Sequence, residues 1–135
     1  MTSRHRPISA HGVATRAEHA RAYLMVAELV RDDDTLPAGN NVVGALSVMA
    51  GIAAADAICG HALGRRPAGE AHHEAIAMLD RATPTASRAR TSLRRLLTSK
   101  TDTQYSPELV SAAKMQQLLA AARQLVGEMD ELLRR

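Results

Sequence analysis

The stretch that decides the fold is VVGALSVMAGIAAADAICGHAL, residues 42–63, in which almost every side chain is apolar or small. A helix that is hydrophobic nearly all round belongs in the centre of a protein, covered by neighbours on several sides. Its glycines and alanines allow the neighbouring backbones to approach closely. The apolar run from Val42 to Ala55 ends at Asp56, short of the roughly 20 residues that a membrane span requires. We therefore expect a central core helix and no membrane contact.

The composition of the chain also favours helices. Its 135 residues, 46% hydrophobic and 23% charged, are the size and balance of one globular domain. Phe and Trp are absent and only two Tyr occur, whereas strands favour aromatic and β-branched residues. The single cysteine, Cys59, cannot form an internal disulfide, and the basic, polar N-terminus lacks the apolar segment of a secretory signal. These features predict an all-α, cytoplasmic protein.

The spacing of apolar residues predicts four or five amphipathic helices. The expected helices cover about residues 15–31, 40–63, 68–82, 85–98 and 106–133. Short connections between them predict an antiparallel up-and-down bundle. Residues 1–14 are expected to form a flexible N-terminal tail, and residues 15–135 a single domain.

Several local signals predict where these helices begin and end. Thr15 with Glu18 has the spacing of a capping box, and Asn40 or Asn41 is a suitable N-cap for the central helix. Gly64 supplies the stop after that helix. The sequence Ser106-Pro107-Glu108 combines an N-cap residue, a proline at the first helical position and an acid in the first turn, so it predicts the start of the last helix.

Asp56 is the most informative residue of the central helix. Its helical neighbours at three, four and seven positions are Met49, Ile52, Cys59 and Leu63, so its carboxylate is expected among apolar side chains. A buried carboxylate is costly unless it is paired. His72, on the next predicted helix, is a plausible partner. The pair is either a purely structural one or an acid that orients a histidine in a pocket, and the sequence leaves both readings open.

The motifs of common catalytic and cofactor sites are missing from the sequence. It contains no phosphate-binding loop, dinucleotide fingerprint, serine-hydrolase elbow or metalloprotease motif. Cys59, His61, His72 and His73 are close in sequence but lack the paired spacing of a zinc site. We therefore expect neither a cofactor nor a metal.

Positive charge gathers in the middle of the chain. Residues 57–100 carry eight Arg and Lys against three Asp and Glu. On the predicted fourth helix, Arg90 and Arg94 border the apolar stripe, where arginines either cover the edge of a core or bind anions. The near absence of aromatic residues argues against base stacking on single-stranded nucleic acid. A surface for phosphates or for an acidic partner remains open.

Three segments together resemble the HEPN domains (higher eukaryotes and prokaryotes nucleotide-binding). They are AGIAAADAICGHALGRR (residues 50–66), HHEAIAMLDR (residues 72–81) and LLTSKTDTQYSPELVSAAKMQQLLAAARQLVGEM (residues 96–129). In that family a basic residue and a Tyr precede the last long helix, and Lys100 and Tyr105 match this arrangement. The resemblance implies an antiparallel helical bundle, often a homodimer, that acts beside a nucleotidyltransferase or in toxin–antitoxin and RNA-directed defence systems.

The resemblance also bears on activity. Ribonuclease members of the family carry an Arg and, four to six residues later, a His just ahead of that Tyr, whereas no His stands there in this chain. We therefore expect a non-catalytic binding or regulatory module for nucleic acid, a nucleotide or a partner protein. Its candidate contact residues are Arg65, Arg66, Arg90, Arg94, Lys100 and Tyr105.

Two alternatives remain at the level of sequence. The first is a metal-independent ribonuclease that uses Arg66 with His72 or His73, because five residues separate Arg66 from His72. The second is a double-stranded DNA-binding protein that uses the basic middle of the chain, with an affinity that falls steeply with salt.

Overall fold

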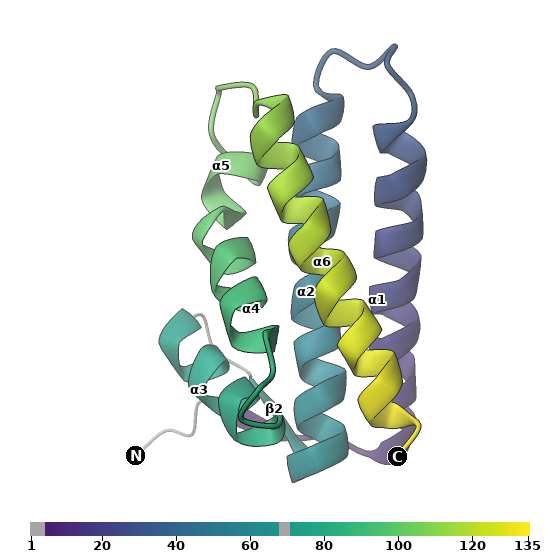
Figure 1. Cartoon of the computed structure of the whole chain (residues 1–135), viewed down its shortest axis with the longest axis vertical. Helices are drawn as coiled ribbons and strands as arrows, with labels where there is room; N and C mark the ends of the chain where they lie inside the picture. Colours follow the sequence, from purple (N-terminus) through teal and green to yellow (C-terminus); the bar gives the residue numbers. More distant parts are fainter. Residues whose placement is uncertain (1–4, 68–70) are drawn as a thin grey trace.

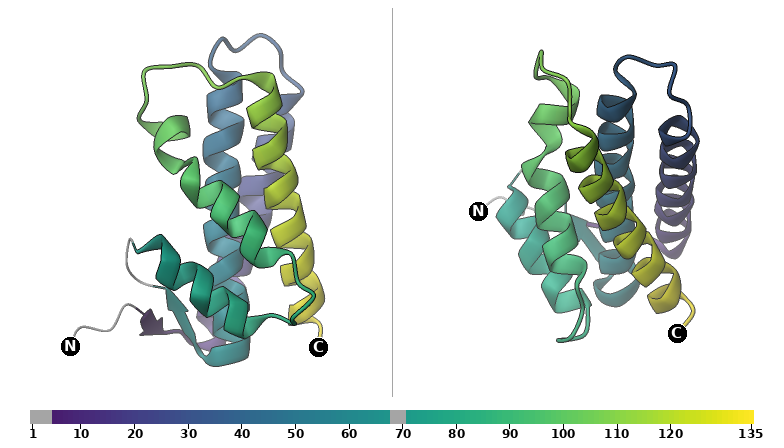
Figure 2. Two further views of the ribbon diagram at one scale, coloured as in Figure 1. Left: turned by 60° about the vertical axis from the view of Figure 1, so that its left-hand side comes forward. Right: turned by 45° about the horizontal axis from the view of Figure 1, so that its top comes forward.

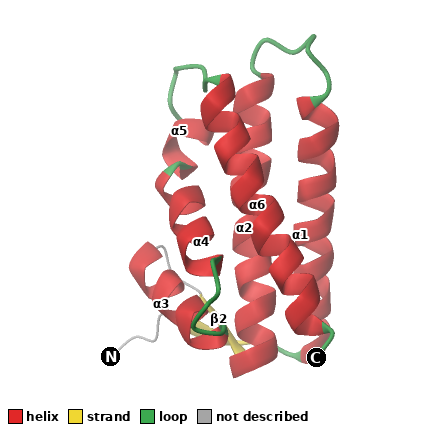
Figure 3. Cartoon of the chain, in the orientation of Figure 1, coloured by secondary structure: helices red, strands yellow, loops and turns green. Residues whose placement is uncertain are grey.

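The structure, a computed structural model that describes residues 5–67 and 71–135, is all-α with a small two-stranded sheet (Figures 1 and 3). The long helices are α1 (Ala10–Arg31), α2 (Gly39–Leu63) and α6 (Ala112–Leu133). The short helices are α3 (His72–Ala82), α4 (Ala89–Thr98) and α5 (Lys100–Gln104). Strand β1 (His5–Pro7) pairs antiparallel with β2 (Arg65–Pro67). The predicted all-α class is confirmed.

Helix α2 lies at the centre of the molecule and contacts every other helix. Helix α6 crosses in front of it, and α1 and α4 lie on opposite sides of this pair (Figures 1 and 2). Helix α3 and the small sheet lie together at the end of the molecule opposite the loop that joins α1 to α2. This arrangement surrounds α2 on several sides, as its composition predicts.

Glycines on α2 determine how closely its neighbours pack. Gly44 faces Thr103 of α5, and a Cβ atom at this position would come within 2.7 Å of the Thr103 methyl group. Gly51 faces Leu96 of α4, and a Cβ there would overlap its side chain. A Cβ at Gly60 would come within 2.6 Å of a Val13 methyl group on α1. Each contact brings a different element against α2, so these positions tolerate little added volume.

By length and composition, α2 is also the one helix among the described residues that could cross a membrane. However, 72% of its most apolar window is buried inside the fold. Val48, Ala53, Ala54 and Ile58 are all at most 1% exposed, because neighbouring helices cover them. The apolar character of α2 is therefore accounted for by its place in the core.

Helix α1 begins five residues earlier than predicted. Ser9 is its N-cap, and the Ser9 hydroxyl accepts a hydrogen bond from the Gly12 amide at 3.0 Å. Thr15 thus lies within the helix, and the predicted capping box with Glu18 is wrong. Of the predicted N-terminal tail, residues 5–7 form β1 and residues 10–14 belong to α1, while residues 1–4 lie outside the described part.

Asn40 and Asn41 do not cap α2, which already begins at Gly39. Their side chains instead hold the segment before α6. The Asn40 and Asn41 amides donate to the Val110 and Glu108 carbonyls, both at 3.1 Å, and the Asn41 oxygen accepts from the Val110 amide at 2.9 Å. Residues 106–111 are not helical, so the start predicted at Ser106 is wrong, and Ser111 caps α6 instead.

The predicted boundaries around α3 and α4 hold in part. Helix α3 ends at Ala82 as expected, but it begins at His72, and residues 68–70 of its predicted first turn lie outside the described residues. Helix α4 begins at Ala89 rather than near residue 85. The Ser87 hydroxyl donates a hydrogen bond to the Glu128 carboxylate of α6 and accepts one from the Ala89 amide at 3.0 Å. These two bonds fix the turn before α4.

Candidate functional site

A cleft of about 230 Å³ opens beside the C-terminal half of α2, next to Asp56. Side chains from α1, α2, β2, α3, α4 and α5 line it, so segments far apart in the sequence meet there. Its charged or titratable lining residues are Arg16, Asp56, Arg66, His72 and Lys100. Its apolar lining residues are Ile52, Ala55, Pro67, Ala75, Leu93 and Leu97.

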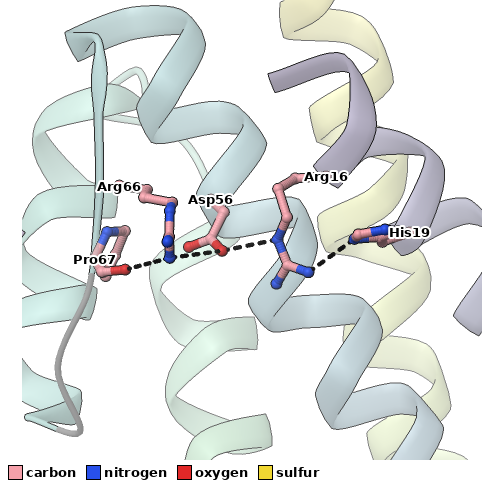
Figure 4. A network of polar contacts seen from close by, with 5 residues as sticks. All are labelled: Arg16, His19, Asp56, Arg66 and Pro67. Atoms are coloured by element: carbon pink, nitrogen blue, oxygen red, sulfur yellow. Dashed lines mark hydrogen bonds and ion pairs between the residues drawn. The ribbon is translucent and has the colours of Figure 1, made fainter. Parts of the chain in front are cut away.

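Asp56 is buried in the wall of this cleft, with only 4% of its surface exposed. Arg16 of α1 donates from Nε to the Asp56 Oδ2 atom at 2.9 Å (Figure 4). Arg66 of β2 approaches the same oxygen from the other side, with its Nη1 atom 4.0 Å away (Figure 4). The carboxylate therefore lies between two guanidinium groups that come from separate segments.

The predicted pair of Asp56 with His72 is not the one that forms. The burial of Asp56 agrees with the sequence, but Arg16 is its hydrogen-bond partner and Arg66 its second ion-pair partner. His72 is the first residue of α3, and its exposed side chain lines the same cleft. Arginine is the better partner for a buried carboxylate because it stays protonated and carries several donors.

Arg16 is held at two points. Besides Asp56, its Nη1 atom lies 3.0 Å from the His19 Nδ1 atom (Figure 4). Because a guanidinium group can only donate, Nδ1 of His19 must be the acceptor, which leaves the proton of the neutral ring on Nε2. The two contacts fix the direction of the Arg16 guanidinium group within the cleft wall.

The small sheet places Arg66 in the cleft. Gly64 ends α2 in a left-handed conformation, with a φ of 71°, and turns the chain into β2. Successive strand residues face opposite sides. Arg65 and Arg66 therefore extend from opposite faces of the sheet: Arg65 donates to the ring and the carbonyl of His5 of β1, while Arg66 lines the cleft. β1 thus holds the strand that carries Arg66.

Electrostatics at the cleft favour an anion. Burial raises the pKa of Asp56 above its ordinary value, and the opposing attraction of Arg16 and Arg66 does not fully offset this effect. Among the described residues, the lining contains three basic side chains, Arg16, Arg66 and Lys100, and one carboxylate. The described lining therefore has an excess of positive charge, and a charge-assisted hydrogen bond to an anion is stronger than one between neutral groups.

Two of the six predicted contact residues lie in the cleft, namely Arg66 and Lys100. Arg65 is turned toward β1, and Tyr105 is 71% exposed after the end of α5. Arg90 forms an exposed ion pair with Asp80 at 3.5 Å. The sixth, Arg94 on α4, is exposed and is not part of the cleft lining. The same holds for His73 on α3, which was named for the ribonuclease alternative.

The residue that the sequence interpretation missed is Arg16. A signal for it exists in the antiparallel pairing of α1 and α2, which a short loop connects. Arg16 lies nearly as far before the end of α1 as Asp56 lies after the start of α2. In two antiparallel helices joined by a loop, residues that are equally far from the loop lie side by side. The register of α1 against α2 therefore indicates that Arg16 and Asp56 are neighbours.

Cys59 lies one turn beyond Asp56 on α2 and is fully buried. Burial, together with the nearby negative charge of Asp56, raises the pKa of the Cys59 thiol to about 12. This thiol therefore stays protonated and suits packing rather than nucleophilic chemistry. Within the described ranges, no group of three or more His, Cys, Asp or Glu side chains is arranged to hold a metal ion.

Comparisons with known proteins do not extend this description. No protein-family model, curated protein or solved structure matches the chain.

Proposed function

We propose that the chain is a non-catalytic, HEPN-like helical bundle that binds a phosphate-bearing ligand, a nucleotide or a nucleic acid, in the cleft beside Asp56. The observation that carries the proposal is the convergence of Arg16, Arg66 and Lys100 on one cleft, in which Asp56 is the one carboxylate among the described lining residues. Arginine and lysine are the side chains that proteins use to bind phosphate.

The placement of these cations supports a site rather than a general basic surface. Each comes from a different element, and Arg16 and Arg66 are anchored by Asp56. A cation that is already positioned loses little conformational freedom when a ligand binds. The exposed arginines of α4, by contrast, border the apolar stripe of an amphipathic helix, where such residues commonly cover the edge of the core.

Isothermal titration with adenosine monophosphate and with a short RNA tests the proposal. We expect Arg66→Ala and Lys100→Ala each to weaken binding by roughly tenfold or more, since each removes a charge-assisted hydrogen bond. Arg94→Ala is the matched control, because it also removes one positive charge but lies outside the cleft. An equal loss in all three variants would contradict a cleft site. In the same titration with duplex DNA, a selective loss of binding in Arg94→Ala would favour the DNA-binding alternative.

One observation favours a second candidate function, the ribonuclease. Arg66 and His72 line the same cleft, so a phosphate held by Arg66 would have an imidazole beside it as a general acid or base. His73 provides a sharp control because it is adjacent in sequence but not part of that lining. Loss of RNA cleavage in His72→Ala, with cleavage retained in His73→Ala, would establish the ribonuclease. Wild-type protein that leaves RNA intact would exclude it.

We also propose that the protein acts as a homodimer or beside a partner protein, as the HEPN resemblance implies. Apolar side chains on the outer face of α1, Met25 and Leu29, are each 65% exposed and could contribute to such a contact. Size-exclusion chromatography with light scattering tests the homodimer directly. A monomeric mass at micromolar concentration would contradict it.

A further inference from the structure

One oxygen of the Asp56 carboxylate has no hydrogen-bond donor within residues 5–67 and 71–135. Its Oδ2 atom accepts from Arg16 and faces Arg66, but Oδ1 accepts no hydrogen bond from the residues that the structure describes. The Asp56 side chain retains 6% exposure, and the residue lines the cleft. The described lining of the cleft therefore combines three basic side chains with a carboxylate oxygen that accepts no hydrogen bond from the described residues.

Such a combination discriminates between anions. A site made only of cations attracts any anion of suitable size, and it attracts an anion of greater charge more strongly. A buried carboxylate repels an anion that has only acceptor oxygens, but it accepts a hydrogen bond from an anion that carries an O–H group. A phosphomonoester, with a second pKa of about 6, carries this group over part of the physiological pH range. Sulfate and phosphodiesters do not carry it.

We infer that Asp56 is a specificity-determining residue that makes the cleft select an anion with its own O–H donor, a phosphate or a phosphomonoester, over a phosphodiester or sulfate. In the bound state the phosphate P–OH donates to Oδ1 of Asp56, while its other oxygens accept from Arg66 and Lys100. Charge-assisted O–H to carboxylate hydrogen bonds are short and strong. No covalent bond changes in this step.

The environment of Asp56 is suited to this role. Burial raises the pKa of its carboxyl group above its ordinary value, and a more basic carboxylate is a better acceptor for an O–H donor. Arg16 fixes the carboxylate through Oδ2, which leaves Oδ1 without a donor among the described residues. At about 30 Å³ per water molecule, the cleft of about 230 Å³ has room for a phosphate group.

This inference rests on the proposed function and narrows it. An internal phosphate of RNA or DNA is a diester and has no P–OH group. The ligand that fits is therefore a mononucleotide or the phosphorylated end of a nucleic acid, rather than the continuous backbone of a strand or duplex.

Titration calorimetry near pH 6 with inorganic phosphate, sulfate and dimethyl phosphate tests the inference. Near this pH sulfate carries the greater charge, so attraction to cations alone predicts that sulfate binds more tightly than phosphate. Hydrogen bonding to Asp56 predicts the opposite order, with phosphate favoured by roughly tenfold or more. Dimethyl phosphate is the matched control, since it has the single negative charge of dihydrogen phosphate but no O–H donor.

Two variants locate the selectivity. In Asp56→Asn we expect sulfate to bind more tightly than in the wild type and the preference for phosphate to be lost, because the amide replaces a charged acceptor. In Lys100→Gln we expect weaker binding of both anions with an unchanged ratio. A phosphate preference that persists in Asp56→Asn would overturn the role of Asp56.

The outcomes with wild-type protein also separate the inference from the function on which it rests. Equal binding of phosphate and sulfate, or tighter binding of sulfate, would overturn the selectivity and leave the anion site standing. No measurable binding of any of the three anions would overturn both. These comparisons need only the wild-type chain, so they test both the selectivity and the anion site even if Asp56→Asn does not fold.

Discussion

Two sites along α2 pack in opposite ways. At Gly44 and Gly51, Thr103 and Leu96 approach at close range and leave no space for additional atoms. At Asp56 the helix lies beside an open cleft, and two arginines accompany the buried carboxylate. The comparison shows that one continuous helix can supply both a close-packed core and the wall of a polar site.

The difference has a physical cause. At the glycine contacts, packing stabilises the fold through dispersion and through the removal of apolar surface from water, so any change of volume is costly. At Asp56 the helix contains a buried charge, which is tolerated only because Arg16 and Arg66 accompany it. Substitutions at the glycine contacts should therefore change stability, whereas substitutions at the cleft should change charge and binding.

The largest expected effect is loss of a core side chain beside α2. Leu125 of α6 is fully buried and packs near Gly51. We expect Leu125→Ala to lower the free energy of unfolding by about 2–5 kcal/mol, through lost burial and the cavity that remains. Leu109→Ala is the control, because Leu109 is 71% exposed and should change stability very little. Urea denaturation of both variants measures the difference, and similar losses would show that the core is assigned incorrectly.

A somewhat smaller effect is expected when atoms are added rather than removed. The new methyl group of Gly51→Ala would overlap Leu96, so we expect a loss of about 1–3 kcal/mol from overpacking. Gly127→Ala, on α6, adds the same methyl group where no atom lies within 4 Å. There the gain in helix propensity should stabilise the protein by about 0.5–1 kcal/mol. Thermal melts of the two variants should thus shift in opposite directions, and shifts of the same sign would refute the close contact at Gly51.

At the cleft, the expected effect is a change in how stability depends on pH. Burial raises the pKa of Asp56 in the folded protein above its ordinary value of 3.8. The folded state therefore binds this proton more tightly than the unfolded state does. The stability that this proton contributes is complete when the pH is below the ordinary pKa of the carboxyl group. It is lost as the pH rises through the pKa of the folded state. Asparagine carries no such proton. The melting temperature of Asp56→Asn relative to wild type should thus rise across this window, and a constant difference would show that the carboxyl pKa is not raised.

The smallest expected effect concerns Cys59. With a thiol pKa of about 12 and no exposed surface, Cys59 should react with iodoacetamide at mildly alkaline pH only when the protein is unfolded. Mass spectrometry of native and urea-unfolded samples measures the labelled fraction. Rapid labelling of the native protein would show that this part of α2 opens to solvent.

The central helix could be predicted from sequence because its apolar composition is nearly continuous and leaves few other arrangements. Helix starts were harder to predict. Asn41 and Ser106 have the character of N-cap residues, but Asn41 instead forms hydrogen bonds to the backbone of Glu108 and Val110, in the non-helical segment before α6. Local signals of this kind depend on tertiary partners that a single sequence does not specify.

The candidate site could be predicted in the same partial way. The burial of Asp56 followed from its apolar helical neighbours, Arg66 from the basic middle of the chain and Lys100 from the family resemblance. The partner of Asp56 did not follow, because a search limited to the next helix along the chain finds His72. Arg16 precedes Asp56 by a full helix and a loop, so its approach depends on the register of the α1–α2 pair.

The most direct test of the account is to map where an anion binds. In a two-dimensional NMR titration with inorganic phosphate, the account predicts that the largest chemical-shift changes occur at Arg16, Asp56, Arg66 and Lys100, the charged residues of the cleft. Changes concentrated at Arg90 and Arg94 of α4, or no saturable change at any position, would contradict it.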